Sequence, residues 1–230
     1  MSCPSGLSPG FGLPRPERSS LCQICTSFGT VGTGELLSFG TGFYFRGRSG
    51  GSRILTAGHN LYNHDLAVMA TLVYLRFERD GDTWLAERTK GRLAVPAAFS
   101  SASTPVREWD FGVIRLDLAL APDRFRPIPL ATAKVAGETR KLIVGYPNAG
   151  DCEGSGNPYC ASFTVFPDGP ANYGYGPQET YIGMSGAPLL GSTPDDLTVR
   201  AYGLHIRGDQ DPERGGVRFT TTVQAAINAL

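Results

Sequence analysis

The chain has no long hydrophobic run and no excess of charge of one sign. No stretch of about 18 consecutive apolar residues occurs, so no transmembrane helix is predicted. Lys and Arg together number 21, as do Asp and Glu, which gives a formal net charge of zero. A balanced charge argues against nucleic acid or a membrane surface as the main partner. Neither partner is therefore expected.

A secretory signal is also missing. The first residues read MSCPSGLSPGFGLPRPERSS, without a basic start followed by an apolar stretch. We expect a cytoplasmic protein, or a secreted one if a leader or parent chain preceded this sequence. Residues 1–35 are rich in Pro, Ser and Gly and are predicted to form an N-terminal extension that wraps the body or stays mobile. Such an extension could contact a regulatory partner or a parent domain.

Cysteine is scarce, and the five cysteines leave at least one thiol unpaired because their number is odd. Cys22 and Cys25 form a CxxC, which favours either a redox pair or half of a zinc site. Cys152 and Cys160 are too far apart in the sequence to supply a second CxxC. They could close a short disulfide in an oxidising compartment, although free thiols are favoured. No metal or other cofactor is expected, and a metal or redox protein is kept as an alternative.

Turn residues and short apolar runs are abundant. Thirty glycines and seventeen prolines predict many turns, and 41% hydrophobic residues predict a packed globule. Runs rich in Val, Leu, Ile, Phe and Tyr predict β-strands in residues 36–120 and again in 135–230. Residues 121–134 contain three prolines and predict a linker. The last residues, TVQAAINAL, predict a helix capped by Thr221 or Thr222. The predicted fold class is all-β, with two barrels and a short C-terminal helix.

Only three histidines are present, which limits the candidates for a catalytic base. His59 ends the string Ile-Leu-Thr-Ala-Gly-His, in which small residues let the chain turn and place the ring in a cleft. His64 has no such context and is predicted to lie in a loop. Asp110 precedes the apolar string Phe-Gly-Val-Ile, where a carboxylate is costly to bury unless it is paired. A histidine N–H is a suitable partner.

Ser185 lies in the string Gly-Met-Ser-Gly-Ala-Pro, whose glycines permit a tight bend that exposes the hydroxyl. The bend would let the N–H groups of Gly183 and Ser185 point into one hole and stabilise an oxyanion. Acyl transfer by serine needs a nucleophile, a base and an acid that orients the base. The order His, Asp, Ser supplies all three and differs from the hydrolase elbow Gly-x-Ser-x-Gly.

Because of the sequence motifs around His59, Asp110 and Ser185, residues 36–230 resemble the chymotrypsin-like serine proteases, and most of all their glutamyl-endopeptidase branch. The family's catalytic motifs are matched by Thr56-Ala57-Gly58-His59, Asp110-Phe111-Gly112-Val113 and Gly183-Met184-Ser185-Gly186. Further likenesses are Gly40-Thr41-Gly42-Phe43, Val144-Gly145-Tyr146-Pro147, Glu179-Thr180-Tyr181 and Gly203-Leu204-His205. The resemblance implies two six-stranded antiparallel β-barrels, a serine endopeptidase acting on a polypeptide substrate, and a triad of His59, Asp110 and Ser185.

The sequence departs from the family at some points. No Ile-Val-Gly-Gly start is present, so activation by trypsin-style cleavage is not predicted. Met184 and Ala187 replace smaller or more polar neighbours of the serine, a change that the chemistry should tolerate.

The resemblance also suggests which residues bind the substrate. Thr180 and His205 match positions at which glutamyl endopeptidases hold an acidic side chain, which predicts cleavage after Glu and then Asp. Gly208 is a further predicted substrate-binding residue. Glu179 supports a rival, because an acid six residues before the serine selects Lys or Arg in trypsin-like enzymes. An inactive protease fold that serves as a binding module is the remaining alternative.

Overall fold

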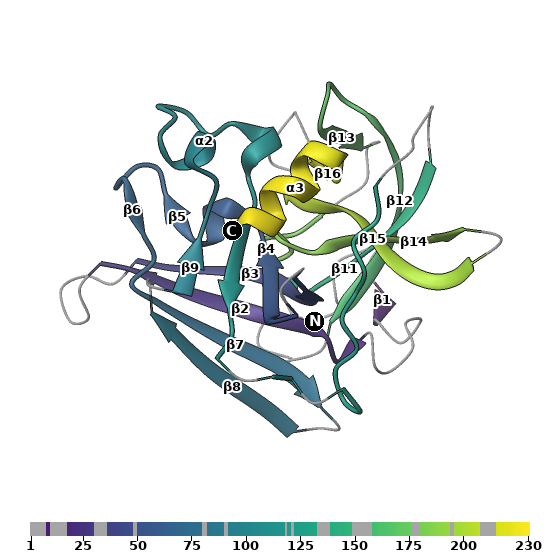
Figure 1. Ribbon diagram of the computed structural model, residues 1–230, viewed down its shortest axis with the longest axis horizontal. Helices are drawn as coiled ribbons and strands as arrows, with labels where there is room; N and C mark the ends of the chain where they lie inside the picture. The colour runs from purple at the N-terminus through teal and green to yellow at the C-terminus, as the bar shows by residue number, and fades with distance from the viewer. Residues whose placement is uncertain are drawn as a thin grey trace.

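The structure is a computed structural model that contains two large β-sheets and a short C-terminal helix (Figure 1). It describes residues 8–9, 18–29, 36–47, 50–79, 82–89, 92–117, 119–120, 122–132, 139–148, 158–175, 180–193, 196–207 and 215–230.

The first sheet has seven antiparallel strands in the order β8-β7-β2-β3-β4-β10-β9. Its strands are β2 (Leu21–Phe28), β3 (Leu36–Arg46), β4 (Ser52–Thr56), β7 (Leu72–Arg79), β8 (Asp82–Thr89), β9 (Leu93–Ala94) and β10 (Gly112–Arg115). The hairpin of β5 (Tyr62–Asn63) and β6 (Val68–Met69) and the short helix α2 (Ala97–Ser100) lie beside it. The sheet curls into a half-barrel, and within the described residues no hydrogen-bonded pairing joins its two edge strands.

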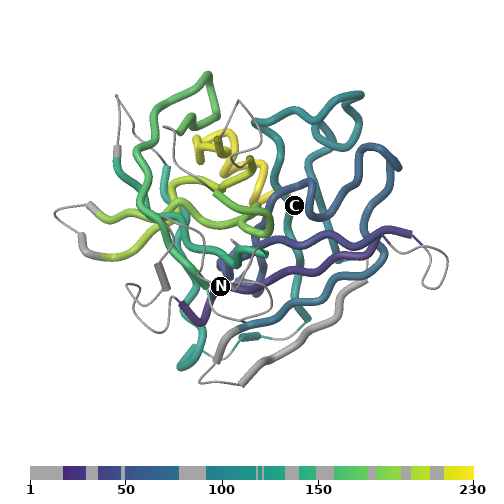
Figure 2. The backbone as a smooth tube through the Cα atoms, turned by 180° about the vertical axis from the view of Figure 1, so that it is seen from behind, coloured from purple at the N-terminus to yellow at the C-terminus, as the bar shows by residue number. Residues whose placement is uncertain are grey.

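The second sheet closes into a barrel of six strands, which Figures 1 and 2 show beside the first sheet. Its ring runs β12-β11-β14-β15-β16-β13 and returns to β12, and β1 (Ser8–Pro9) pairs with β12 outside the ring. The strands are β11 (Thr139–Gly145), β12 (Tyr159–Pro167), β13 (Asn172–Tyr175), β14 (Pro188–Thr193), β15 (Asp196–Arg207) and β16 (Gly215–Arg218). The predicted all-β double barrel with a C-terminal helix is confirmed, with a half-barrel as its first member.

Strands β4 and β10 of the first sheet are buried on both faces. Ile54 and Ile114 lie in the core of the half-barrel, whereas Leu55 and Val113 lie in a second core between the two sheets. Successive side chains of a strand point to opposite faces, so neighbours in β4 and β10 serve two different cores. This double burial explains why apolar residues are adjacent in each strand, as in Ile54-Leu55 and Val113-Ile114. It also places their ends at the junction of the barrels.

The C-terminal helix α3 (Thr221–Ala229) packs against this junction. Its buried side chains, Val223 and Ile227, pack in the core between the sheets. The predicted helix is present, but its N-cap is Thr220, not Thr221 or Thr222. The Thr220 hydroxyl accepts a hydrogen bond from the Val223 N–H at 3.2 Å. Thr220 has extended backbone angles, as an N-cap residue requires.

The strand β2 lies within the segment that we predicted to be an N-terminal extension, residues 1–35. It pairs with β3 on one side and β7 on the other, so it is an interior strand of the first sheet. The division into an extension, two barrels and a linker at 121–134 stays a prediction, and part of the extension contributes to the half-barrel.

The same strand argues against a metal or redox role for the CxxC. Cys22 and Cys25 are three residues apart in β2, so their side chains point to opposite faces. Cys22 is fully buried in the half-barrel core, and this burial raises the pKa of its thiol. Among the described residues no group of three or more His, Cys, Asp or Glu side chains could hold a metal ion. Cys152 lies outside the described residues, so neither the favoured free thiols nor the alternative disulfide with Cys160 is tested.

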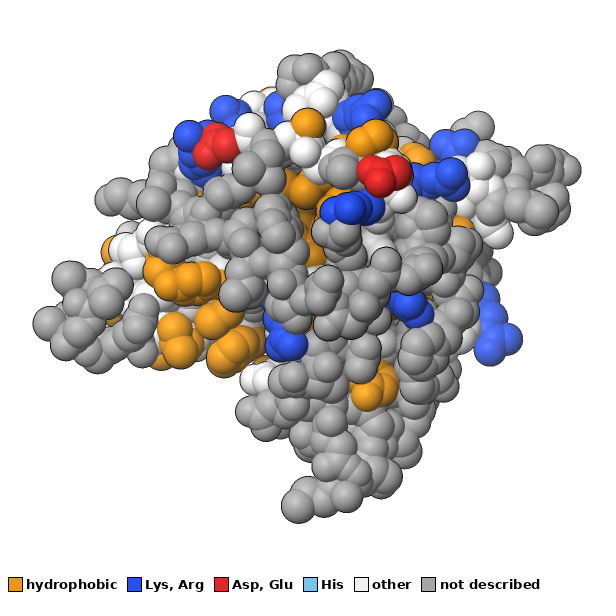
Figure 3. Space-filling model, turned by 90° about the horizontal axis from the view of Figure 1, so that it is seen from below, with side chains coloured by type: hydrophobic (Ala, Val, Ile, Leu, Met, Phe, Trp, Pro, Cys, Tyr) orange, Lys and Arg blue, Asp and Glu red, His pale blue; other side chains and the backbone are white. Residues whose placement is uncertain are grey.

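Some hydrophobic side chains remain exposed on the first sheet. Phe39 and Tyr74 both stand opposite Cys25 in the ladder and are about two-fifths exposed. Figure 3 views the lower face of the molecule, where hydrophobic side chains gather toward one end.

None of the described helices has the length and apolar character needed to cross a membrane.

We expect Thr220→Ala to lower the free energy of unfolding by about 1 kcal/mol, because the Val223 N–H loses its cap. The control is Thr221→Ala, which changes an exposed helical residue without a cap bond. Urea denaturation measures both variants. Equal stabilities for the two variants would contradict the assignment of Thr220 as the cap.

Candidate active site

His59 and Asp110 form a close pair at the ends of two neighbouring strands. His59 lies in a 3-10 helix, Gly58–Asn60, just after β4, and Asp110 lies just before β10. The His59 ring Nδ1 is 2.8 Å from Asp110 Oδ2, and the His59 backbone N–H donates to Asp110 Oδ1 at 2.9 Å. Both carboxylate oxygens therefore hold the same residue, one through its ring and the other through its backbone.

The carboxylate is buried and the imidazole is partly open. The Asp110 side chain is 5% exposed, whereas that of His59 is 35% exposed. A Cβ at Gly58 would lie 2.9 Å from the Phe99 ring and 3.1 Å from Asp110 Oδ1. Only glycine therefore lets the chain pass this close to the carboxylate, which explains the glycine before the histidine.

The charge of Asp110 sets the protonation of His59. Burial of the imidazole lowers its pKa, but the negative charge of Asp110 and the hydrogen bond to it raise the pKa more. The positive charge of Arg207 opposes them weakly, and the pKa of His59 lies above its ordinary value of 6.5.

Ser185 lies beside this pair because its backbone is bound to the first sheet. Its carbonyl oxygen accepts hydrogen bonds from the Thr41 N–H at 2.8 Å and from Asn60 Nδ2 at 2.9 Å. Asn60 directly follows His59 and is almost fully buried. The Ser185 hydroxyl is 3.5 Å from the Ile206 carbonyl, at the long limit for a hydrogen bond. The structure therefore gathers the three predicted residues at the junction of the barrels.

Several polar residues hold the serine loop through hydrogen bonds that were not predicted from the sequence. Asn60 Nδ2 also donates to Thr56 Oγ1 at 2.9 Å, and Thr56 Oγ1 donates to the Thr41 carbonyl at 2.7 Å. The Thr41 hydroxyl donates to the Gly183 carbonyl at 2.8 Å. Apart from the Asn60–Thr56 bond, these bonds join residues 15 and 142 positions apart in the chain, which sequence patterns do not reveal.

Two glycines shape the loop around the serine. Gly183 and Gly186 have φ angles of +91° and +93°, in the left-handed region that favours glycine. A Cβ at Gly186 would lie 2.0 Å from the Thr41 carbonyl oxygen. The Met184 N–H closes a turn onto the Tyr181 carbonyl at 3.0 Å. In the described part of the chain, the N–H groups of Gly183 and Ser185 bond to no backbone carbonyl, so both are available to an acceptor.

The predicted substrate-binding residues Thr180 and His205 are both buried, each 1% exposed. The Thr180 hydroxyl has no hydrogen-bond partner among the described residues. The backbone of His205 bonds to the serine loop, through its N–H to Ala187 O and through its carbonyl to Gly186 N, both at 2.8 Å. Its ring Nδ1 is 3.3 Å from the Tyr175 hydroxyl. Burial, with the nearby charge of His59, lowers the pKa of His205 to about 3.

Other predicted residues lie elsewhere or are not described. Glu179 and Gly208 lie outside the described residues. His64 follows β5 in a turn, as predicted, and its ring packs edge-on against Phe99 at 4.5 Å. Met184 is fully buried in the core of the second barrel.

Two cavities are formed by described residues away from His59 and Ser185. One of about 310 Å³ lies between β3, the Pro127–Leu130 segment and α3. The other, of about 230 Å³, lies between Trp109, Ala171 and Val223. Neither of these two cavities is lined by the candidate catalytic residues.

Three solved structures that are similar to this chain are proteases. A Glu endopeptidase in complex with MPD has a TM-score of 0.71 and 22% identity, over 97% of this chain and 95% of that chain. The protease Anisep from Arthrobacter nicotinovorans has a TM-score of 0.70 and 17% identity, over 94% and 96%. The thermostable serine protease AL20 from an extremophilic microorganism has a TM-score of 0.67 and 16% identity, over 93% and 97%.

The fold is therefore that of the chymotrypsin-like serine proteases, as the sequence resemblance predicted. Within that class, a Glu endopeptidase is among the similar structures. No protein-family model matches the chain, and no curated protein matches it in sequence.

We expect Asp110→Asn to lower the pKa of His59 below 6.5, because burial and the charge of Arg207 remain while the carboxylate is lost. NMR titration of the His59 ring in a Ser185→Ala background measures this shift. Asp65→Asn, an exposed change in the turn after β5, is the control and should leave the His59 pKa unchanged. The same His59 pKa in both variants would show that Asp110 does not control the imidazole.

Proposed function

We propose that this protein is a serine endopeptidase that uses His59, Asp110 and Ser185 as its catalytic triad. The observation that carries the proposal is the Asp110–His59 pair, with Ser185 bound through Asn60 to the same short helix. A purely structural role for the Asp110–His59 pair would not require the His59 ring to be partly exposed. It would also not require a nearby serine in a turn whose glycines have positive φ angles. The fold shared with proteases supports the same class of reaction.

In the proposed reaction, the Ser185 oxygen attacks the carbonyl carbon of the peptide bond. His59 Nε2 takes the serine proton as the C–O bond forms, while Asp110 holds Nδ1–H and stabilises the imidazolium. The N–H groups of Gly183 and Ser185 donate to the oxyanion. The imidazolium then gives its proton to the leaving amine as the C–N bond breaks. Water, deprotonated by His59, releases the acyl group from Ser185 by the same steps.

The serine must turn toward the imidazole for the first step. Its hydroxyl is at the long limit of a bond to the Ile206 carbonyl, so rotation about its Cα–Cβ bond gives up little. Catalytic hydrogen bonds are often long in free enzymes and shorten when substrate binds. The weak bond to Ile206 is therefore compatible with Ser185 as the nucleophile.

We expect Ser185→Ala to reduce peptide cleavage by about a millionfold and Asp110→Asn by about ten thousandfold, without unfolding either protein. In the wild type, kcat/KM should rise with pH through a midpoint above 6.5, because Asp110 raises the pKa of His59, which must be neutral to accept the proton. Cleavage of a peptide library by the wild type and by both variants measures the loss of activity, and the same assay over a range of pH measures the midpoint. EDTA should change neither result. Normal turnover by Ser185→Ala, or activity lost in EDTA and restored by zinc, would contradict the proposal.

We further propose that the enzyme cleaves after acidic residues, Glu before Asp. Thr180 and His205 lie on the two segments that flank the serine loop, and the buried Thr180 hydroxyl lacks a partner among the described residues. A substrate carboxylate could accept hydrogen bonds from this hydroxyl and from the His205 ring. A buried donor without a partner among the described residues gains one when the carboxylate binds. One similar structure is that of a Glu endopeptidase.

Peptides that differ only in the residue before the cut test this specificity. We expect kcat/KM to be highest for Glu, lower for Asp and lowest for Lys, Arg and Leu. Thr180→Val, which removes the hydroxyl at nearly constant volume, should lower kcat/KM for Glu by about tenfold and leave Leu unchanged. A preference for Lys or Arg would support the rival based on Glu179 and leave the triad intact.

A further inference from the structure

A buried phenol lies directly behind His205. Tyr175, in β13, is 7% exposed, and its hydroxyl is 3.3 Å from His205 Nδ1. The two rings are stacked, with centroids 5.6 Å apart and an angle of 25° between their planes. A Cβ at Gly216 would lie 2.5 Å from the Tyr175 hydroxyl oxygen. The glycine therefore leaves the space through which the phenol reaches the imidazole.

The phenol of Tyr175 keeps its proton in this pair. Burial raises the pKa of Tyr175 well above its ordinary value, so the hydroxyl keeps its proton. Burial also keeps the His205 ring neutral, with one nitrogen that donates and one that accepts. Among the described residues, Nδ1 of His205 is the hydrogen-bond partner of the Tyr175 hydroxyl.

The choice of tautomer follows from the count of donors once a carboxylate is bound. If Nδ1 carried the proton, it would donate to the Tyr175 oxygen, leave the phenol proton without a described acceptor, and turn the lone pair of Nε2 toward the carboxylate. A buried donor without a partner costs free energy, so this arrangement is disfavoured. If Nδ1 is unprotonated, it accepts the phenol proton, and the ring proton on Nε2 donates to the carboxylate.

We propose that Tyr175 is a positioning residue that holds His205 in the tautomer with the proton on Nε2, and so makes the ring a fixed donor to the substrate's acidic side chain. This inference deepens the proposed function and rests on it for the identity of the ligand. The backbone N–H and carbonyl of His205 bond to Ala187 and Gly186, so the backbone from which the ring extends is held in place. Tyr175 then fixes the direction and the proton of that ring.

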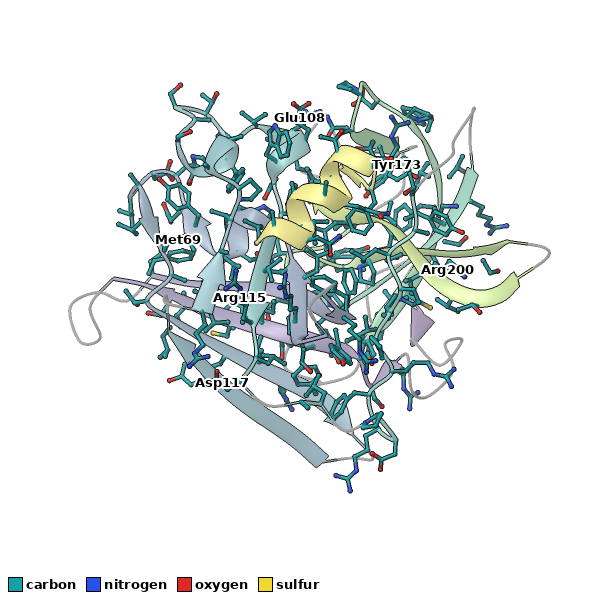
Figure 4. The ribbon with its side chains drawn as sticks, viewed as in Figure 1. Met69, Glu108, Arg115, Asp117, Tyr173 and Arg200 are labelled. Atoms are coloured by element: carbon teal, nitrogen blue, oxygen red, sulfur yellow. The ribbon has the colours of Figure 1, made fainter. Side chains whose placement is uncertain are left out.

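The chain supplies a matched control on the same strand. Tyr173 lies two residues before Tyr175 in β13, faces the same barrel core and is 1% exposed (Figure 4). Its hydroxyl has no hydrogen-bond partner among the described residues. Tyr173→Phe therefore removes a buried phenol oxygen without touching His205, whereas Tyr175→Phe removes the one that bonds to it.

The first experiment reads the tautomer without catalysis. In the Ser185→Ala protein with a bound peptide that has Glu before the cut, the ¹⁵N shifts of the two His205 ring nitrogens distinguish Nε2–H from Nδ1–H. We expect Nε2–H in this protein and after Tyr173→Phe, and a mixture or Nδ1–H after Tyr175→Phe. Nδ1–H in the starting protein, or the same Nε2–H tautomer after Tyr175→Phe, would overturn the inference.

The second experiment reads specificity. Tyr175→Phe should lower kcat/KM for a peptide with Glu before the cut by about tenfold and leave a Leu peptide unchanged, while Tyr173→Phe changes neither. Equal effects of both variants on the Glu peptide would refute the positioning role and leave the protease proposal standing. Failure of the wild type to cleave any peptide would refute the proposed function, while the NMR result would still decide the tautomer.

Discussion

The candidate site depends on the burial of one carboxylate. Asp110 is almost fully removed from water, and an isolated buried charge would be costly. Two hydrogen bonds from His59, one from the ring and one from the backbone, offset that cost. Because these bonds need both an N–H of the chain and an N–H of the ring, they fix the histidine in position, orientation and tautomer. The glycine before His59 makes the close approach possible.

The position of that carboxylate follows from the packing of the barrels. Strands β4 and β10 contribute one face to the half-barrel core and the other to the core between the sheets. Their ends must therefore lie where the two barrels meet, and His59 and Asp110 are at those ends. Thr41 and Asn60 extend the same junction to the second barrel through the Ser185 carbonyl. The three residues are thus brought together by contacts that also join the two halves of the chain.

Much of this arrangement could be predicted from the sequence, and the reasons are local. The apolar runs of β4 and β10 and the strings around His59, Asp110 and Ser185 are short-range signals. Strand β2 was missed because its polar residues and cysteines resemble the extension before it. The roles of Thr41, Asn60 and Tyr175 depend on contacts between distant parts of the chain. Sequence periodicity carries no information about such contacts.

The most direct test of the account is covalent labelling with a fluorophosphonate, which reacts only with a serine activated by a neighbouring base. We expect stoichiometric labelling of the wild type, mapped by mass spectrometry to Ser185, and none of His59→Ala, although that variant keeps the serine. An unlabelled, folded wild-type protein, or equal labelling of His59→Ala, would contradict the claim that His59 activates Ser185.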